Sequence, residues 1–206
     1  MVLSRRLETI ASSIPLHRNV IDIGCDHGLL DIYLAKTRKD IKVLGTDISP
    51  FSIASAEKKA AAFSLPNLLF EVRDGLKDFP LQEEVLVLSG MGAFTILDIL
   101  KEASLNGNML IISAHKNVDI VRKEIVKWGY YIEDEKDIFD KKWYCILTFQ
   151  KGKKEYREEE YLIGPFAYKN IEYIEYLYQK EKKLAQKKGV VTPLLKALEN
   201  AKRATQ

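Results

Sequence analysis

Short apolar runs alternate along the chain with segments of helical spacing. Ser49 and Pro50, for example, give an N-cap and a first-turn proline for the helical segment that follows. The alternation predicts repeated βα units, and so an α/β fold around a mostly parallel sheet. Runs rich in Val, Ile and Leu predict five strands, at residues 19–24, 42–47, 68–74, 84–90 and 108–114.

After the fifth run the pattern changes. Residues 118–129 predict a helix that ends at Gly129, and residues 130–152 predict two strands joined by an acidic connection. Beyond them strand signals end, and residues 166–188 and 192–204 predict two helices.

We therefore expect two domains. Residues 1–152 would form a domain around the sheet, and residues 153–206 a helical domain.

Composition narrows the class of protein. With 206 residues and 47% hydrophobic content, the chain can bury a substantial core, and no stretch approaches the roughly 18 apolar residues of a membrane span. We expect a cytoplasmic protein that does not associate with a membrane and needs no obligate protein partner. Cys25 and Cys145 cannot form a disulfide framework, and neither has metal-ligand spacing with the three histidines. We expect no structural metal.

Charge is uneven along the chain. Residues 151–206 carry 13 Lys+Arg against 8 Asp+Glu, whereas residues 1–150 carry 19 against 21. A basic extension on a near-neutral body favours a polyanion such as nucleic acid, although lysines on a solvated helix face explain it equally well. The densest basic cluster contains Lys180, Lys182, Lys183, Lys187 and Lys188.

The segment "IDIGCDHGLLDIYLA" (21–35) places a glycine turn between a strand and a helix. A dinucleotide site needs glycine where this loop has Asp26, because the backbone must approach a pyrophosphate there. A carboxylate would repel that ligand, which disfavours nicotinamide and flavin cofactors. Gly24 and Gly28 still provide the turn, and the acid suits a ligand with ammonium and sulfonium charges. S-adenosylmethionine is such a ligand.

Further aspartates lie at equivalent places, at the ends of the next strand runs. Asp47 ends the second strand run, where a carboxylate can accept hydrogen bonds from ribose hydroxyls, and Asp74 ends the third, where it could meet the adenine amino group. Taken singly, such aspartates often only cap a helix, but their occurrence in successive units favours a cofactor site. The predicted cofactor-binding set is Asp22, Gly24, Cys25, Gly28, Asp47, Ile48, Asp74, Gly75, Ser89 and Gly90.

The segment "SGMGAF" (89–94) follows the fourth run. Its glycines leave the backbone accessible at the edge where open α/β sheets bind ligands. Met91 could pack against a flat substrate. A plain strand-to-helix turn is the alternative. No (Asn/Asp)-Pro-Pro-(Tyr/Phe) motif is present, so an exocyclic amine is the less favoured target.

At this point the chain resembles the TrmK family, bacterial tRNA (adenine(22)-N1)-methyltransferases. The resemblance rests on "LSRRLETIA" (3–11), the glycine loop with its Asp-His, "RDGL" (73–76), "SGMG" (89–92) and "WGYYI" (128–132). It implies a class I, Rossmann-like methyltransferase domain, a coiled-coil-like helical C-terminal domain, and methylation of N1 of adenine twenty-two in tRNA. Ala93 and "SAHKN" (113–117) depart from the family pattern.

Four residues are candidates for catalysis: Asp26, His27, Arg6 and Met91. N1 of adenine can attack a methyl group without prior deprotonation, but the product ring is cationic, and Asp26 could stabilise that charge. His27 could orient the base or relay a proton, or merely satisfy the turn. Arg6 lies in the first turn of a predicted helix, where a cation opposes the helix dipole, so RNA phosphate or the active site could favour it. His17 and His115 are interpreted as structural or surface residues.

Two other functions stay open from sequence alone. One is a methyltransferase for a protein or small molecule, in which the basic tail is incidental. The other is a non-catalytic RNA-binding protein on a methyltransferase scaffold. Retention of Asp47 and Asp74 argues against the second, because a decayed site need not keep them.

Overall fold

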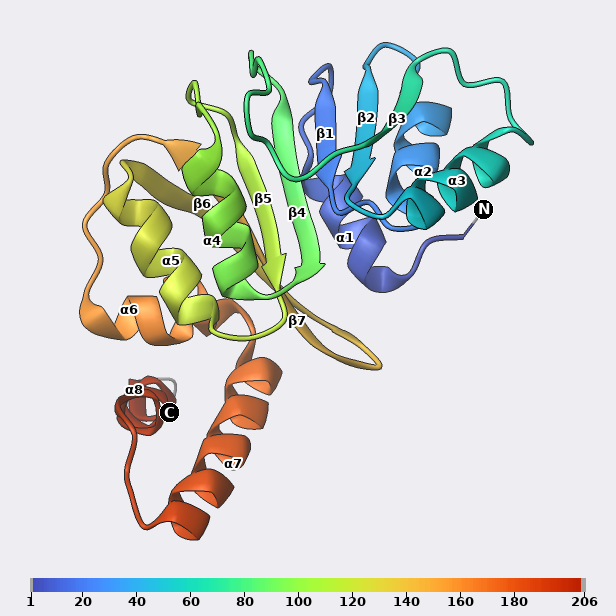
Figure 1. Ribbon diagram of the computed structural model, residues 1–206. Helices are drawn as coiled ribbons and strands as arrows, with labels where there is room; N and C mark the ends of the chain where they lie inside the picture. Colours follow the sequence, from blue (N-terminus) through green and yellow to red (C-terminus); the bar gives the residue numbers. More distant parts are fainter. Residues whose placement is uncertain (1, 205–206) are drawn as a thin grey trace.

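A seven-stranded sheet forms the centre of the computed structural model, which describes residues 2–204 (Figure 1). Its strand order is β3-β2-β1-β4-β5-β7-β6. The first five strands are parallel, and β7 pairs antiparallel with both β5 and β6. The predicted α/β class and all five predicted parallel strands are confirmed. The strands are β1 (Val20–Ile23), β2 (Val43–Asp47), β3 (Leu68–Val72), β4 (Val85–Met91), β5 (Leu110–Ala114), β6 (Tyr130–Asp140) and β7 (Lys142–Lys151).

Helices cover both faces of the sheet, and alternate strand residues point to opposite faces. In β4, Val85 and Val87 pack toward α1 and α2, whereas Leu86 and Leu88 pack toward α4 and α5. Both faces of the parallel strands are therefore buried, which explains their continuous apolar sequences. The helices on the sheet are α1 (Arg5–Ser13), α2 (Leu29–Thr37), α3 (Pro50–Ala60), α4 (Ala93–Glu102) and α5 (Val118–Lys127).

The turn between β6 and β7 lies later than the sequence predicted. The acidic segment belongs to β6 itself, and the chain reverses at Lys141, which has a φ of 61°. A register shift between Ile132 and Asp134 places Glu135 on the α5 face of the sheet, where it is buried. The acidic residues were read as a loop because the partner of Glu135 is distant in sequence.

That partner is Arg122 in α5. Arg122 Nε donates to Glu135 Oε2 at 3.1 Å, and the side chains of Arg122 and Glu135 are 3% and 1% exposed. Arg122 Nη1 also donates to the carbonyl oxygens of Tyr161 and Leu162, at 3.0 and 3.3 Å. A single buried guanidinium therefore joins α5, β6 and the chain that follows the sheet.

In the described part of the chain, three α helices rather than the predicted two follow the sheet: α6 (Glu158–Ile163), α7 (Ile171–Lys188) and α8 (Pro193–Ala204), with a 3-10 turn at Ala167–Lys169. Figure 1 shows α8 end-on while α7 runs nearly in the plane, so the two cross steeply. This differs from the coiled-coil-like pairing implied by the resemblance. The unpredicted α6 explains the difference, because α8 buries Ala197 and Leu198 in one cluster with Ile163 as well as Ile174 of α7.

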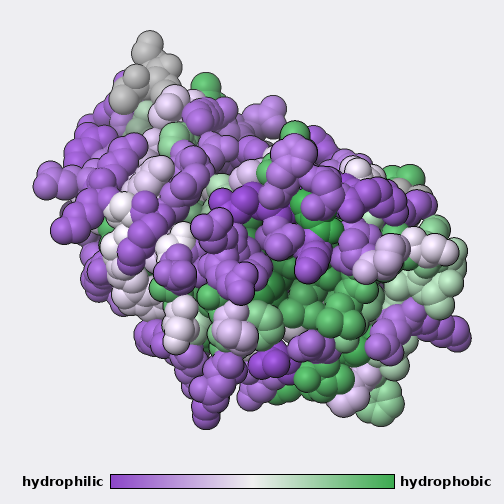
Figure 2. All heavy atoms as spheres, turned by 90° about the horizontal axis from the view of Figure 1, so that it is seen from above, coloured by the Kyte–Doolittle hydropathy of each residue, from purple (hydrophilic) through white to green (hydrophobic). Residues whose placement is uncertain are grey.

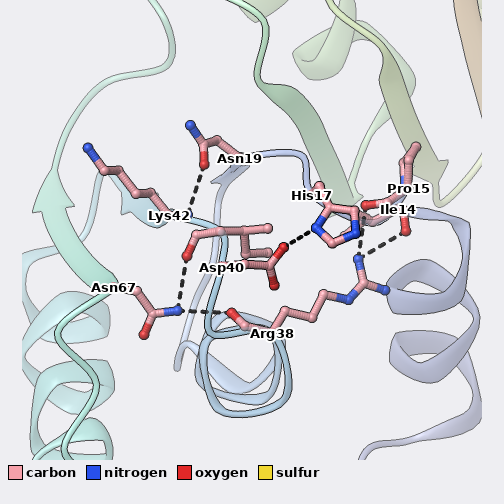
Figure 3. Close-up of polar contacts among 9 residues, drawn as sticks. Ile14, Pro15, His17, Asn19, Arg38, Asp40, Lys42 and Asn67 are labelled. Carbon is pink, nitrogen blue, oxygen red and sulfur yellow. Dashed lines mark hydrogen bonds and ion pairs between the residues drawn. The ribbon is translucent and has the colours of Figure 1, made fainter.

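Polar contacts close the edge of the sheet at the amino ends of its strands (Figure 3). Arg38 Nη1 donates to the carbonyl oxygens of Ile14 and Pro15, at 3.0 and 3.2 Å, which ties the end of α2 to the end of α1. Asn67 Nδ2 donates to the Arg38 carbonyl at 3.1 Å, and His17 pairs with Asp40. His17 is thus a structural and surface residue, as predicted.

The surface seen from above is largely hydrophilic, with hydrophobic residues gathered in one area (Figure 2). Within residues 2–204, the helices are all too short or too polar to cross a membrane.

The buried Arg122–Glu135 pair yields a stability prediction. Arg122→Met leaves Glu135 charged and unpaired out of water, and we expect it to lower the free energy of unfolding by about 3–5 kcal/mol. Lys127→Ala, which removes the exposed pair with Glu124, is the control and should cost less than about 1 kcal/mol. Denaturant titration followed by circular dichroism measures both. Equal effects of the two substitutions would show that the buried pair does not hold the fold.

Candidate active site

A cavity of about 610 Å³, here called the cleft, opens at the carboxyl ends of the parallel strands. Open α/β sheets bind ligands at this edge. Loops that follow β1, β2, β3 and β4 form its walls, and α1 adds Arg6 and Leu7. All predicted site residues except Gly28 line the cleft: Arg6, Asp22, Gly24, Cys25, Asp26, His27, Asp47, Ile48, Asp74, Gly75, Ser89, Gly90 and Met91.

The glycine loop after β1 needs its glycines for steric reasons. Gly24, Asp26 and Gly28 have φ values of 77°, 52° and 66°, in the left-handed region. A Cβ atom on Gly28 would lie 2.6 Å from Phe70 Cζ, so Gly28 lets the start of α2 pack onto β3. Gly28 therefore shapes the loop from behind and does not line the cleft.

Asp47 connects two loops at the rim of the cleft. Its Oδ2 accepts a hydrogen bond from the Asp26 amide at 3.0 Å, and its Oδ1 accepts one from the Ser49 amide at 2.9 Å. The carboxylate therefore fixes both the glycine loop and the start of α3. Each oxygen keeps a second lone pair, so the group can still accept hydrogen bonds from a ligand.

Asp22 supplies a buried acid at the floor of the cleft. Its Oδ1 has no hydrogen-bond partner among the described residues. Burial raises the pKa of Asp22 to about 7, Arg6 opposes that rise, and Asp47 adds to it. Asp31, buried behind it in α2, has its pKa raised well above the usual value by burial and by Asp22. The floor is thus rich in carboxyl groups and short of cations.

Asp26 and His27 lie at the open side. Their side chains are 71% and 51% exposed, and Asp26 Oδ1 lies 3.6 Å from His27 Nε2. Both groups are accessible to a substrate that enters from solvent.

Arg6 reaches the cleft from α1. Its Nη1 donates to Ser89 Oγ at 3.4 Å, and its backbone amide donates to Asp140 Oδ2 at 3.1 Å. The guanidinium carbon also lies 5.3 Å from the centre of the Tyr144 ring. The β6–β7 hairpin (130–151) therefore holds Arg6 in place.

Residues 3–147 match a family described as a methyltransferase domain. The chain belongs to this methyltransferase-domain family. A tRNA (adenine(22)-N(1))-methyltransferase of Bacillus subtilis is 28% identical over 81% of this chain and 75% of that protein. These findings agree with the acidic glycine loop at the carboxyl edge of the sheet.

Solved structures share the fold of this methyltransferase over nearly its whole length. TrmK of M. capricolum, in complex with S-adenosyl-homocysteine, superposes with a TM-score of 0.83 at 24% identity and covers 99% of this chain and 98% of its own. A Streptococcus pneumoniae protein in complex with S-adenosyl-L-methionine gives 0.85 at 23% identity, with 97% and 99% covered. The shared fold extends through the C-terminal helices, and together with the Bacillus subtilis relative it confirms the resemblance to the TrmK family.

Two predicted residues of the methyltransferase site also make packing contacts. The Cys25 side chain packs in an apolar cluster with Ile53 and Phe70, and burial raises the pKa of its thiol. Met91 lies over the glycine loop, since a Cβ atom on Gly24 would come within 2.6 Å of Met91 Cε. Met91 thus packs the loop as well as lining the cleft.

The predicted site set lacks eight residues that line the cleft: Leu7, Ile23, Leu29, Leu30, Arg73, Thr95, Ile99 and His115. His115 was interpreted as structural or surface, but it follows β5 directly and its amide donates to the Met91 carbonyl at 3.0 Å. Its pKa is lowered by burial and by the nearby Lys142 and Arg6. Its position just after a parallel strand was the signal that could have found it.

The raised pKa of the buried Asp22 predicts that the stability of this methyltransferase depends on pH. Because the pKa of Asp22 is higher in the folded than in the unfolded chain, folding is favoured below the unfolded value of 3.8 and loses free energy as pH rises toward about 7. Asp22→Asn cannot ionise, so it should reduce this loss by up to roughly 4 kcal/mol. Unfolding midpoints measured from pH 4 to 8 test this, and parallel curves for both proteins would contradict it.

Proposed function

We propose that this protein transfers a methyl group from S-adenosylmethionine to N1 of adenine 22 in tRNA. The observation that carries the proposal is the cleft itself. Its buried Asp22 Oδ1 has no hydrogen-bond partner among residues 2–204, and it lies behind an acidic loop that a phosphate ligand would avoid. The Bacillus subtilis relative, named for this reaction, supports the choice of substrate.

The residues present fit the cofactor. The unpartnered Asp22 oxygen suits an ammonium group, and Asp47, held by two backbone amides, suits ribose hydroxyls. Asp74 suits the adenine amino group, and the cleft glycines leave backbone accessible to the methionine part. When bound, S-adenosylmethionine supplies an electrophilic methyl group.

The exposed pair at the open side suits the target base. Asp26 can stabilise the positive charge that develops on the adenine ring, and His27 can orient the base or accept a proton. Arg6 offsets part of the charge of Asp22 and offers a donor beside Ser89. Positioning of the base against the methyl group should contribute most of the rate.

The C-terminal segment suits the remainder of the tRNA. Lys180, Lys183 and Lys187 are exposed, and their spacing of three and four residues puts them on one side of α7. We propose that residues 153–206 act as the tRNA-binding domain beside a methyltransferase domain of residues 1–152.

The experiments below distinguish the proposed function from two alternatives. A methyltransferase for another substrate would bind S-adenosylmethionine but leave tRNA unmethylated. A non-catalytic RNA-binding protein would bind tRNA without the cofactor. The retained Asp47 and Asp74 in the cleft favour the catalytic reading.

The first experiment combines a methylation assay on unmodified total tRNA with calorimetry of S-adenosylmethionine binding. The wild-type protein should yield 1-methyladenosine, detected by nucleoside mass spectrometry. Asp47→Ala should weaken cofactor binding by about 1.5–3 kcal/mol, because it removes a charged acceptor. Asp98→Ala, which changes an exposed aspartate of α4, should bind normally. Absence of 1-methyladenosine with intact cofactor binding would point to another substrate.

A second experiment separates chemistry from binding. Asp26→Asn keeps the shape of the side chain but removes its charge, and we expect single-turnover methylation of saturating tRNA to slow by roughly 10²-fold. The matched control is Asp78→Asn, because Asp78 is exposed, has a left-handed φ of 55° and lies outside the cleft. A full rate with weakened cofactor binding would assign Asp26 to the cofactor instead.

A further inference from the structure

A second cavity, of about 440 Å³, lies between the start of α1 and the tip of the β6–β7 hairpin. We call it the hairpin groove. Figure 1 shows the hairpin extending beyond the carboxyl ends of the parallel strands, toward the end of the molecule that carries α7. The groove is lined by Ser4, Arg6, Asp140, Lys141, Lys142 and Tyr144.

The hairpin groove adjoins the cleft directly. Arg6 lines both cavities, with its guanidinium between Ser89 in the cleft and the Tyr144 ring in the groove. Lys142 also acts on His115 at the rim of the cleft, where it helps to lower the pKa of that histidine. A polymer strand with one unit bound in the cleft can therefore continue along the hairpin groove.

The charge of the groove is positive. Its one carboxylate, Asp140, is already engaged by the Arg6 amide, and hydrogen bonds from this amide and from the Ser4 hydroxyl hold the pKa of Asp140 below its usual range. Lys141 and Lys142 are exposed, and Lys141 contributes to the lowered pKa of its neighbour Asp140. The ammonium of Lys142 lies 5.0 Å from the centre of the Tyr144 ring. Exposed cations beside an aromatic ring are typical of nucleic-acid contacts.

The hairpin that carries these cations is anchored. Successive residues of a strand point to opposite faces, so Trp143 points away from the groove. Its ring lies 5.2 Å from that of Tyr173 and 6.1 Å from that of Tyr176, both on α7. The groove is therefore held at a fixed place between the cleft and the helix whose lysines are proposed to contact tRNA.

We propose that the hairpin groove binds the backbone of the RNA strand that flanks the methylated adenosine, with Lys141 and Lys142 contacting its phosphates. This rests on the proposed function, because the cleft must hold a nucleotide for its neighbours to reach the groove. Phosphate contacts fix the position of the strand, whereas recognition of the base itself belongs to the cleft.

The test replaces the two lysines together, Lys141→Ala with Lys142→Ala. We expect the Kd for unmodified tRNA to rise by at least tenfold at moderate salt, and the slope of log affinity against log salt to become shallower by about 1.4, roughly 0.7 for each lost contact with single-stranded RNA. Cofactor affinity and the methylation rate at saturating tRNA should match the wild type. Lys58→Ala with Lys59→Ala, exposed lysines near the far end of α3, is the matched control.

Phosphate ethylation interference locates the contact. Ethylation of phosphates that flank the methylated adenosine should weaken binding of the wild-type protein but not of the groove variant. Unchanged affinity and salt slope, or the same interference pattern in both proteins, would overturn the groove assignment while leaving methylation intact. Failure of the wild type to bind S-adenosylmethionine would instead reject the proposed function, and tRNA binding by the groove would still be measured independently.

Discussion

The charge of Arg6 offsets the acidic floor of the cleft, and much of the architecture serves to bring it there. Asp22 is buried and its pKa is raised to about 7, so an uncompensated negative charge at this place would be costly. Arg6 comes from the first helix, is held by Asp140 and Tyr144 from the hairpin, and donates to Ser89 after β4. The first helix, the end of the central strand β4 and the hairpin at one edge of the sheet therefore meet at one side chain.

A second buried cation ties the C-terminal helices to the sheet. Arg122 is paired with Glu135 and also satisfies the carbonyl oxygens of Tyr161 and Leu162 at the end of α6. A guanidinium out of water needs these partners, so α6 is part of the buried structure and not a loosely tethered appendage. Trp143 of the hairpin packs against Tyr173 and Tyr176, which places the start of α7 beside the hairpin.

The glycine loop shows how one substitution of residue type changes the chemistry of a common fold. Where a phosphate-binding loop has glycine, this chain has Asp26, which takes a left-handed conformation with a φ of 52°. The Asp47 carboxylate accepts the Asp26 amide hydrogen bond, so the strained turn is held by a neighbouring loop. The exposed carboxylate of Asp26 then remains accessible to a substrate.

The sequence by itself determined the parallel core and nearly all of the cleft, because strand periodicity and strand-end residues depend on local order along the chain. Glycine, aspartate and serine at the ends of successive strands meet whenever the sheet is parallel. Tertiary structure alone decided the rest. Glu135 became a strand residue because Arg122 neutralises it, and α8 crosses α7 steeply because α6 shares its apolar side. Both outcomes depend on contacts between different elements, which no local pattern records.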